Sequence, residues 1–134
     1  GDVRGATPRQ FVFDQAIAPD GTQEDIFRHA CRDTDVVQGV LEGINGCVMC
    51  YGQTGAGKTF TLGNTSAGNE GLVYRSLAHI FNRVDSDSAK REVLLSYVQI
   101  YNEQLQDLLR PSSCVELRED PQAGVVLLGA ESRE

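Results

Sequence analysis

Residues 52–59 constrain the fold of this chain more than any other stretch. They read Gly-Gln-Thr-Gly-Ala-Gly-Lys-Thr and match G-x-x-x-x-G-K-[ST], the phosphate-binding loop of nucleoside triphosphatases. Glycines let such a loop turn sharply, so that its backbone N–H groups can close around phosphates. The apolar stretch 47–51 runs into the loop and residues 58–62 can open a helix behind it, in the strand, loop and helix order of such sites. The alternative is a glycine-rich turn that binds no ligand.

The motif assigns a separate task to each part of the loop. The expected phosphate-binding residues are Gly52, Gln53, Thr54, Gly55, Ala56, Gly57, Lys58 and Thr59. Lys58 is the candidate catalytic residue, because its ammonium group would neutralise the β and γ phosphates. The Thr59 hydroxyl is expected to ligate Mg²⁺, a hard cation that prefers oxygen ligands.

Size and composition narrow the class of protein. With 134 residues, 40% of them apolar, the chain has the size and composition of one globular domain. Its net charge of −7 argues against a nucleic-acid surface, and neither a membrane-spanning apolar run nor a signal sequence is found. We expect a soluble intracellular protein that binds neither nucleic acid nor membranes. The acidity serves solubility or, alternatively, attracts a basic partner.

Four cysteines, at positions 31, 47, 50 and 114, show no repeated spacing and predict no disulfide framework. Cys47 and Cys50 are spaced like a redox or zinc pair. On a strand, however, residues three apart point to opposite faces and would not converge on one metal. We therefore expect buried structural cysteines.

Apolar periodicity predicts an alternation of strands and helices. The expected strands are 11–14, 47–51, 92–101, 115–118 and 125–128, and the expected helices are 22–41, 58–62, 72–84 and 103–109. Strand-helix-strand units form parallel sheets covered by helices, whereas the last two strands are expected to form a hairpin. The predicted fold class is therefore α/β in a single domain.

Several side chains have expected places in these elements. Thr22 is expected to cap the first helix together with Asp25, and Tyr97 and Tyr101 are expected in the core because they share one strand face. The buried stripe of the helix that begins at residue 72 is expected to comprise Val73, Leu77, Ile80, Phe81 and Val84.

Three stretches together resemble the kinesin motor domain. Residues 45–61 are similar to N-G-x-x-x-x-Y-G-Q-T-x-x-G-K-T-x-T, residues 96–109 to S-Y-x-E-I-Y-N-E-x-x-x-D-L-L, and residues 118–125 to R-E-D-P-x-x-G-V. Phe11-Val12-Phe13-Asp14 also matches the F-x-F-D strand of that family. The matches occur in the family's order and cover most of the chain.

The resemblance implies an ATPase that couples hydrolysis to movement along microtubules, with ATP and Mg²⁺ as cofactors. It implies that Gly52 to Thr59 hold the phosphates and Mg²⁺, and that Phe60 stacks on adenine; ordinary aromatic packing is the alternative for Phe60. The implied fold is a mixed, largely parallel sheet of the phosphate-loop NTPase type, flanked by helices. The implied location is the microtubule cytoskeleton in the cytoplasm, with a coiled-coil dimer as the candidate assembly of the full-length protein.

Departures from the family pattern limit what residues 1–134 are expected to do alone. The sequence contains no R-x-R-P strand before Phe11, and neither an N-x-x-S-S-R nor a D-L-A-G-S-E switch after Gly129. Phosphoryl transfer depends on positioning by several such parts. We therefore expect a truncated front part of a motor domain that turns over little ATP alone, with most microtubule-facing elements outside it. The alternatives are a non-motile kinesin-like binding protein and an unrelated phosphate-loop enzyme such as a GTPase or small-molecule kinase.

Overall fold

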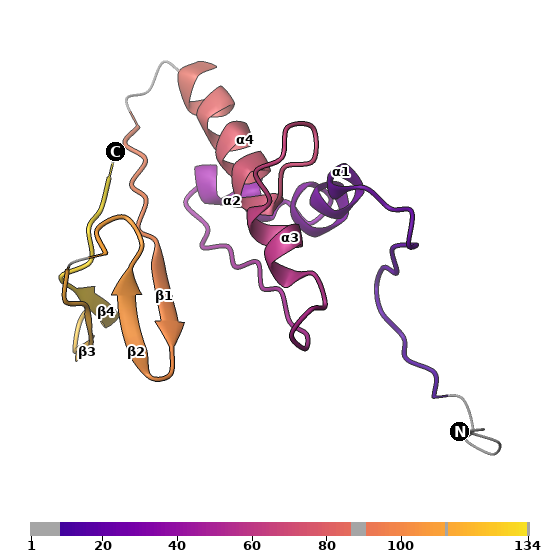
Figure 1. Ribbon diagram of the computed structural model, residues 1–134. Helices are drawn as coiled ribbons and strands as arrows, with labels where there is room; N and C mark the ends of the chain where they lie inside the picture. The colour runs from indigo at the N-terminus through magenta and orange to yellow at the C-terminus, as the bar shows by residue number, and fades with distance from the viewer. Residues whose placement is uncertain (1–8, 87–90, 112, 134) are drawn as a thin grey trace, which may run out of the picture. The chain divides into compact units, whose positions relative to one another are not determined.

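The computed structural model describes residues 9–86, 91–111 and 113–133. The chain divides into two compact units, residues 1–88 and residues 89–134. All described helices belong to the first unit and all described strands to the second (Figure 1). Helices and strands are thus both present, as the predicted α/β class requires, but they do not alternate along the chain.

The first helix, α1 (Gln23–Phe27), begins with the predicted capping box. The Thr22 hydroxyl accepts a hydrogen bond from the Asp25 N–H at 3.1 Å, and the Asp25 carboxylate accepts one from the Thr22 N–H at 3.0 Å. These reciprocal bonds satisfy backbone donors that a helix start leaves without partners. The side-chain hydrogen bond from Thr22 holds the pKa of Asp25 below its ordinary value.

The prediction of one continuous helix over residues 22–41 is wrong. After α1 comes a π-helical turn, Arg28–Arg32, and then a separate helix α2 (Val36–Leu41). Asp35, with φ at 55°, interrupts the path between them, a left-handed conformation that Asp tolerates better than most residues. The Thr34 hydroxyl also bonds back to the Ala30 carbonyl at 2.9 Å. Such side-chain bonds compete with regular helix, which explains the break.

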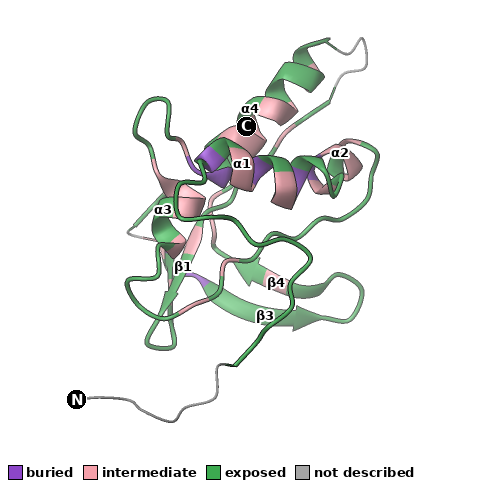
Figure 2. Ribbon diagram, turned by 90° about the vertical axis from the view of Figure 1, so that its right-hand side faces the viewer, coloured by how far each residue is buried: buried purple, intermediate pink, exposed green. Residues whose placement is uncertain are grey.

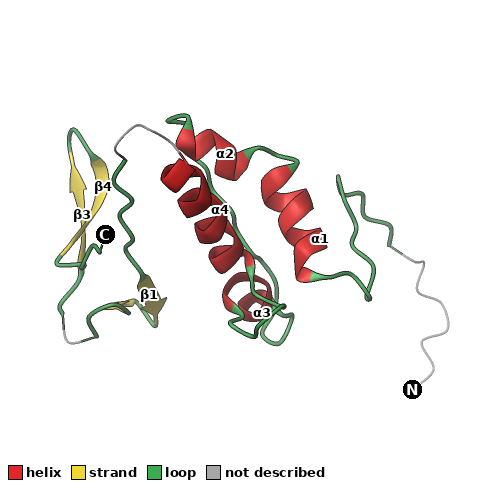
Figure 3. Ribbon diagram, turned by 90° about the horizontal axis from the view of Figure 1, so that it is seen from above, coloured by secondary structure: helices red, strands yellow, loops and turns green. Residues whose placement is uncertain are grey.

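The helices around residues 58–86 confirm the prediction. Helix α3 (Lys58–Gly63) follows the glycine-rich loop, and helix α4 (Leu72–Ser86) resumes at the expected residue. Helix α4 contacts α1, α2 and α3 (Figure 3). The loop between α3 and α4 is closed by a hydrogen bond from the Gly71 N–H to the Asn64 carbonyl at 2.9 Å.

A small apolar cluster holds the helical unit together (Figure 2). Its buried members are Phe27, Cys31, Val37 and Leu72, and the half-buried residues packed on it are Ile26, Ala30, Leu62 and Ile80. The predicted stripe of α4 is only partly correct, because Val73 and Phe81 are 37% and 44% exposed. The buried face of α4 is therefore narrower than its apolar face.

The predicted strands 11–14 and 47–51 are absent from the structure. Their apolar side chains face solvent: Phe11 is 71% exposed, Met49 80% and Tyr51 95%. A strand exists only where a neighbour takes up its backbone hydrogen bonds, and no described residue pairs with either segment. The described strands form two antiparallel pairs, so the predicted largely parallel sheet is not seen.

The first two strands of the second unit form a hairpin, and the second of them lies where the sequence predicts a helix. Strands β1 (Val98–Tyr101) and β2 (Gln104–Asp107) pair antiparallel, with Tyr101 opposite Gln104. Asn102 and Glu103 connect them with φ of 49° and 61°, the left-handed pair that two-residue hairpin turns need. The helix expected over residues 103–109 is therefore wrong, because this turn reverses the chain before a helix can start.

The long strand expected over residues 92–101 is also shorter in the structure. Its regular part is β1, preceded by an isolated antiparallel bridge between Leu95 and Arg133. Tyr97 and Tyr101 are 52% and 75% exposed rather than part of a core. One neighbouring strand pairs with an edge of β1, and three of the four residues of β1 are exposed.

The hairpin predicted near the end of the chain is confirmed. Strands β3 (Glu116–Asp120) and β4 (Gly124–Leu128) pair antiparallel, with Asp120 opposite Gly124. The Asp120 carboxylate accepts hydrogen bonds from the Ala123 and Gln122 N–H groups in the connecting turn, both at 2.8 Å. These bonds lower the pKa of Asp120. In the part of the chain that the structure describes, no helix has the length and apolarity to cross a membrane.

Candidate functional site

The candidate site is the glycine-rich loop 52–59, which leads into α3. Gly55 and Gly57 have φ of 81° and 88°, values that a side chain disfavours. Gly57 is also the residue from which α3 starts, and its carbonyl accepts the Thr61 N–H at 2.8 Å. The backbone conformation therefore accounts for glycine at both positions.

The Lys58 side chain connects the start of α3 to the beginning of this loop. Its ammonium nitrogen donates to the carbonyl oxygens of Gly52 at 2.7 Å and Gln53 at 2.8 Å. The side chain thus returns from the start of α3 to the first residues of the loop. An ammonium group carries three donors, so the two carbonyls leave one donor for an anion held by the loop.

Thr59 carries the hydroxyl of the loop that could contribute an oxygen to a phosphate-bound Mg²⁺. Thr59, in the first turn of α3, is exposed, as are Thr54 and Ala56. Within residues 9–86, 91–111 and 113–133, no cluster of three or more His, Cys, Asp or Glu could hold a metal ion. Mg²⁺ commonly takes one or two protein oxygens and completes its shell with phosphate and water. The Thr59 hydroxyl is suited to be one of those oxygens.

Phe60 lies one residue beyond the loop, and its side chain is 50% exposed. Its backbone carbonyl accepts a hydrogen bond from the side-chain amide of Gln23 at 2.6 Å. Gln23 itself is only 2% exposed. Sequence reasoning missed this residue, because the bond joins positions 37 apart and no spacing in the sequence signals it.

An ion-pair network also fixes the first turn of α1. Glu24 contacts Arg75 of α4 at 2.5 Å and Arg32 of the π-helical turn at 3.0 Å. Arg75 additionally donates to the Glu70 carbonyl at 2.7 Å, and its side chain is 19% exposed. Because Arg75 is largely buried and doubly engaged, it orients α1 against α4 more firmly than an exposed pair would.

One hollow in the helical unit is lined by residues other than those of the glycine-rich loop. It has a volume of about 240 Å³ and is lined by Phe27, Cys31, Arg32, Asp35, Val37, Gln38, His79 and Arg83. Burial raises the pKa of the Cys31 thiol, which is 1% exposed. The thiol therefore stays neutral at physiological pH and is a poor nucleophile.

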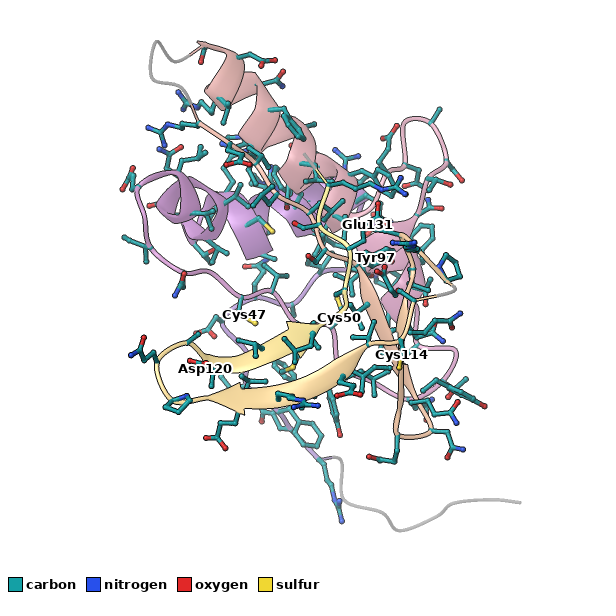
Figure 4. The ribbon with its side chains drawn as sticks, turned by 90° about the vertical axis from the view of Figure 1, so that its left-hand side faces the viewer. Cys47, Cys50, Tyr97, Cys114, Asp120 and Glu131 are labelled. Atoms are coloured by element: carbon teal, nitrogen blue, oxygen red, sulfur yellow. The ribbon has the colours of Figure 1, made fainter. Side chains whose placement is uncertain are left out.

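Three of the four cysteines, Cys47, Cys50 and Cys114 (labelled in Figure 4), are less buried than the sequence predicts. Cys31 is buried, but Cys47 and Cys114 are exposed and Cys50 is half-buried. The prediction of buried structural cysteines is therefore right only for Cys31. Cys47 and Cys50 were expected on a buried strand, and residues 47–51 form no strand in the structure.

Comparison with known proteins identifies relatives along most of the chain. The kinesin-like protein KIF18B of Gallus gallus is 43% identical over 122 residues, which are 90% of this chain and 15% of that protein. Kinesin-like protein KIN-8B of Arabidopsis thaliana is 40% identical over 127 residues, 92% of this chain and 15% of that protein. Kinesin-like protein KIF19 of Xenopus laevis is 36% identical over 124 residues, 90% of this chain and 12% of that protein. The chain thus spans between 12% and 15% of the length of these curated relatives.

The family model for the kinesin motor domain matches residues 2–134. That match includes the glycine-rich loop, the α3 helix behind it and both hairpins. The chain therefore belongs to the kinesin motor domain family.

Proposed function

We propose that this chain is the ATP-binding part of a microtubule motor, in which ATP hydrolysis drives movement along the polymer. The observation that carries the proposal is the position of Lys58. Its ammonium group donates hydrogen bonds to the carbonyls of Gly52 and Gln53 at the start of the glycine-rich loop. These two bonds leave one ammonium donor for a phosphate held by the loop. Membership of the kinesin motor domain family supports the same function.

Each residue of the loop has a role in this proposal. Gly52, Gln53, Thr54, Gly55, Ala56 and Gly57 supply backbone around the phosphates, and Lys58 neutralises their charge. Thr59 provides an oxygen ligand for Mg²⁺, and the half-exposed ring of Phe60 stacks on the adenine. When bound, Mg²⁺ would neutralise charge that develops on the phosphate oxygens.

We further propose that residues 1–134 form part of a larger motor domain with a mixed, largely parallel sheet. The support is the exposure of two apolar segments, 11–14 and 47–51, in which Phe11 and Tyr51 are 71% and 95% exposed. Apolar, β-branched and aromatic runs of this kind pack well on a sheet. Further strands of the motor domain would give both segments partners and cover them.

Substitution of Lys58 in the natural full-length protein tests the proposed motor function. We expect Lys58→Ala to lower microtubule-stimulated ATP turnover by about 10²-fold or more and to stop gliding of microtubules on a protein-coated surface. The control is Arg83→Ala, which removes an exposed cation of α4 outside the loop and should leave both activities intact. Undiminished gliding of the Lys58→Ala protein would contradict the assignment.

The same assays distinguish the non-motile alternative. A kinesin-like protein that only holds nucleotide or microtubules would bind one or both of these ligands in its natural form without turning over ATP. Absence of ATP binding together with tight GTP binding would instead point to an unrelated phosphate-loop enzyme. Turnover that rises when microtubules are added supports the motor.

A further inference from the structure

The side chain of Gln23 is the most deeply buried polar group near the candidate nucleotide site. It is 2% exposed, and its amide nitrogen donates to the backbone carbonyl of Phe60 at 2.6 Å. Its side-chain oxygen is buried without a partner among the described residues. An unsatisfied buried polar atom is costly, so the protein keeps a polar residue here at an energetic disadvantage. That disadvantage indicates a role beyond packing.

Helix α1, which carries Gln23, is fixed by contacts of the residues on either side of Gln23. The capping box of Thr22 and Asp25 orders the first turn of α1, and the neighbouring Glu24 contacts Arg75 of α4 at 2.5 Å. Gln23 therefore extends from a fixed turn rather than from a mobile loop. A hydrogen bond from such a support restricts the position of its acceptor.

The acceptor belongs to the residue proposed to contact the base. A carbonyl oxygen has two lone pairs, so the Phe60 carbonyl can accept the Gln23 amide in addition to a helical bond. Because the Phe60 carbonyl group and its Cα atom lie in one planar peptide unit, fixing this carbonyl restricts the position of the Cα atom that carries the ring. Half of the Phe60 side chain remains exposed and available to a ligand.

The phosphate end of the site has anchors of its own. Lys58 is tied to the Gly52 and Gln53 carbonyls, and none of these bonds involves Gln23. The loop can therefore keep its phosphate-binding shape when the bond between Gln23 and Phe60 is lost. The two ends of a bound nucleotide would depend on different groups of the protein.

We propose that Gln23 is a positioning residue for the base half of the nucleotide site, an inference that rests on the proposed nucleotide-binding function. Its amide holds the backbone of α3 at Phe60, so that the ring meets the base from a fixed backbone position. Gln23 thereby sets the affinity for the nucleoside part of the ligand and leaves the affinity for the phosphate chain unchanged.

The variant Gln23→Met tests this inference with little disturbance of the fold. Methionine is unbranched, similar in size and a good helix former, and it removes the unpartnered oxygen together with the donor. In the natural full-length protein, the dissociation constants of Mg-ATP and of Mg-tripolyphosphate, which lacks base and sugar, are measured by calorimetry. We expect the constant for ATP to rise about tenfold, as loss of a base-aromatic stack predicts, and that for tripolyphosphate to change by less than about twofold.

Two further variants show whether Gln23 acts through Phe60. Phe60→Ala should weaken ATP binding similarly, and adding Gln23→Met to it should have no additional effect, because residues that act through one contact are not additive. The matched control is Gln38→Met on α2, where the glutamine amide donates to the Glu42 carboxylate at 3.0 Å. This control should alter neither dissociation constant.

The outcomes separate the inference from the proposed function. Equal weakening of both ligands by Gln23→Met would show that Gln23 supports the whole site, and unchanged ATP affinity would show that it positions nothing. Either result overturns the inference while leaving nucleotide binding in place. If the natural protein binds neither ATP nor tripolyphosphate, the proposed function fails, and this inference fails with it.

Discussion

The helical unit and the β unit of this chain are stabilised in different ways. In the described residues up to Ser86, four buried apolar side chains form a cluster, and ion pairs of Glu24 and Arg75 join α1 to α4. Among residues 91–111 and 113–133, Val115 is the only buried apolar side chain. The β unit relies instead on backbone pairing and on hydrogen bonds to carboxylates, above all that of the buried Asp107.

The Asp107 carboxylate connects separate segments of the β unit by hydrogen bonds. Its side chain is fully buried and accepts four hydrogen bonds, from the N–H groups of Leu109, Arg110 and Glu131 and from the Ser113 hydroxyl. The hydrogen bond from the Glu131 N–H, at 2.6 Å, is the largest cause of the lowered pKa of Asp107. In a helix, the backbone N–H and C=O groups bond to one another locally. Separate strands and turns leave some of these groups without a local partner, so they need another group that connects them. The comparison predicts different responses to mutation and to pH.

The largest effect is expected in the small apolar cluster of the helical unit. Leu72→Ala should destabilise α1 and α4 by about 3 kcal/mol, because it removes a buried side chain and leaves a cavity. Hydrogen exchange measured by mass spectrometry on the full-length protein would report the loss as faster exchange in both helices. Val73→Ala is the matched control, since Val73 is 37% exposed. Similar exchange in both variants would show that the cluster does not hold the unit.

A smaller effect, about tenfold in amide exchange, is expected in the β unit for Asp107→Asn. One side-chain oxygen would remain for Leu109 and Arg110, but an amide donor would face the Glu131 N–H and the Ser113 hydroxyl. Exchange should rise in residues 104–131 and stay unchanged in α1 and α4. Asp120→Asn, in the exposed β3–β4 turn, is the control and should affect that turn alone.

The same carboxylate makes the β unit sensitive to acid. The pKa of Asp107 is lowered in the folded state, so its contribution is complete above the ordinary aspartate pKa of about 4. It is lost as the pH falls from there through the lowered value. Protection factors of residues 104–131 should therefore decline below about pH 4 in the natural protein. They should decline less in the Asp107→Asn variant; an identical pH dependence would exclude Asp107 as the cause.

The smallest effect is a gain in stability at the β1–β2 turn. Glu103 has φ at 61° without being glycine, and Glu103→Gly should stabilise the hairpin by about 0.5–1 kcal/mol, because glycine adopts this conformation without steric cost. Slower exchange of the β1 and β2 amides would measure the gain. Glu103→Ala shortens the side chain but keeps the unfavourable conformation, so it should give no gain. Equal slowing in both variants would contradict the turn geometry.

The elements that sequence reasoning predicted correctly have local causes. Thr22 and Asp25 lie three residues apart and form the cap they predict. The loop glycines precede α3, and residues 115–128 contain both strands of a hairpin and its turn. Residues 103–109 show the limit of such reasoning: their sequence is compatible with a helix, but Asn102 and Glu103 adopt a left-handed turn that starts a hairpin instead.

The sequence by itself determined the family, the phosphate-loop motif and the starts of α1, α3 and α4, because each depends on patterns of residues close together in the chain. The tertiary structure alone decided which apolar segments are buried, why residues 11–14 and 47–51 are not strands, and which distant groups meet. The bonds from Gln23 to Phe60 and from the Glu131 N–H to Asp107 join positions 37 and 24 residues apart. No local pattern encodes such contacts, since a strand or a buried polar group is defined by partners that only the folded chain brings together.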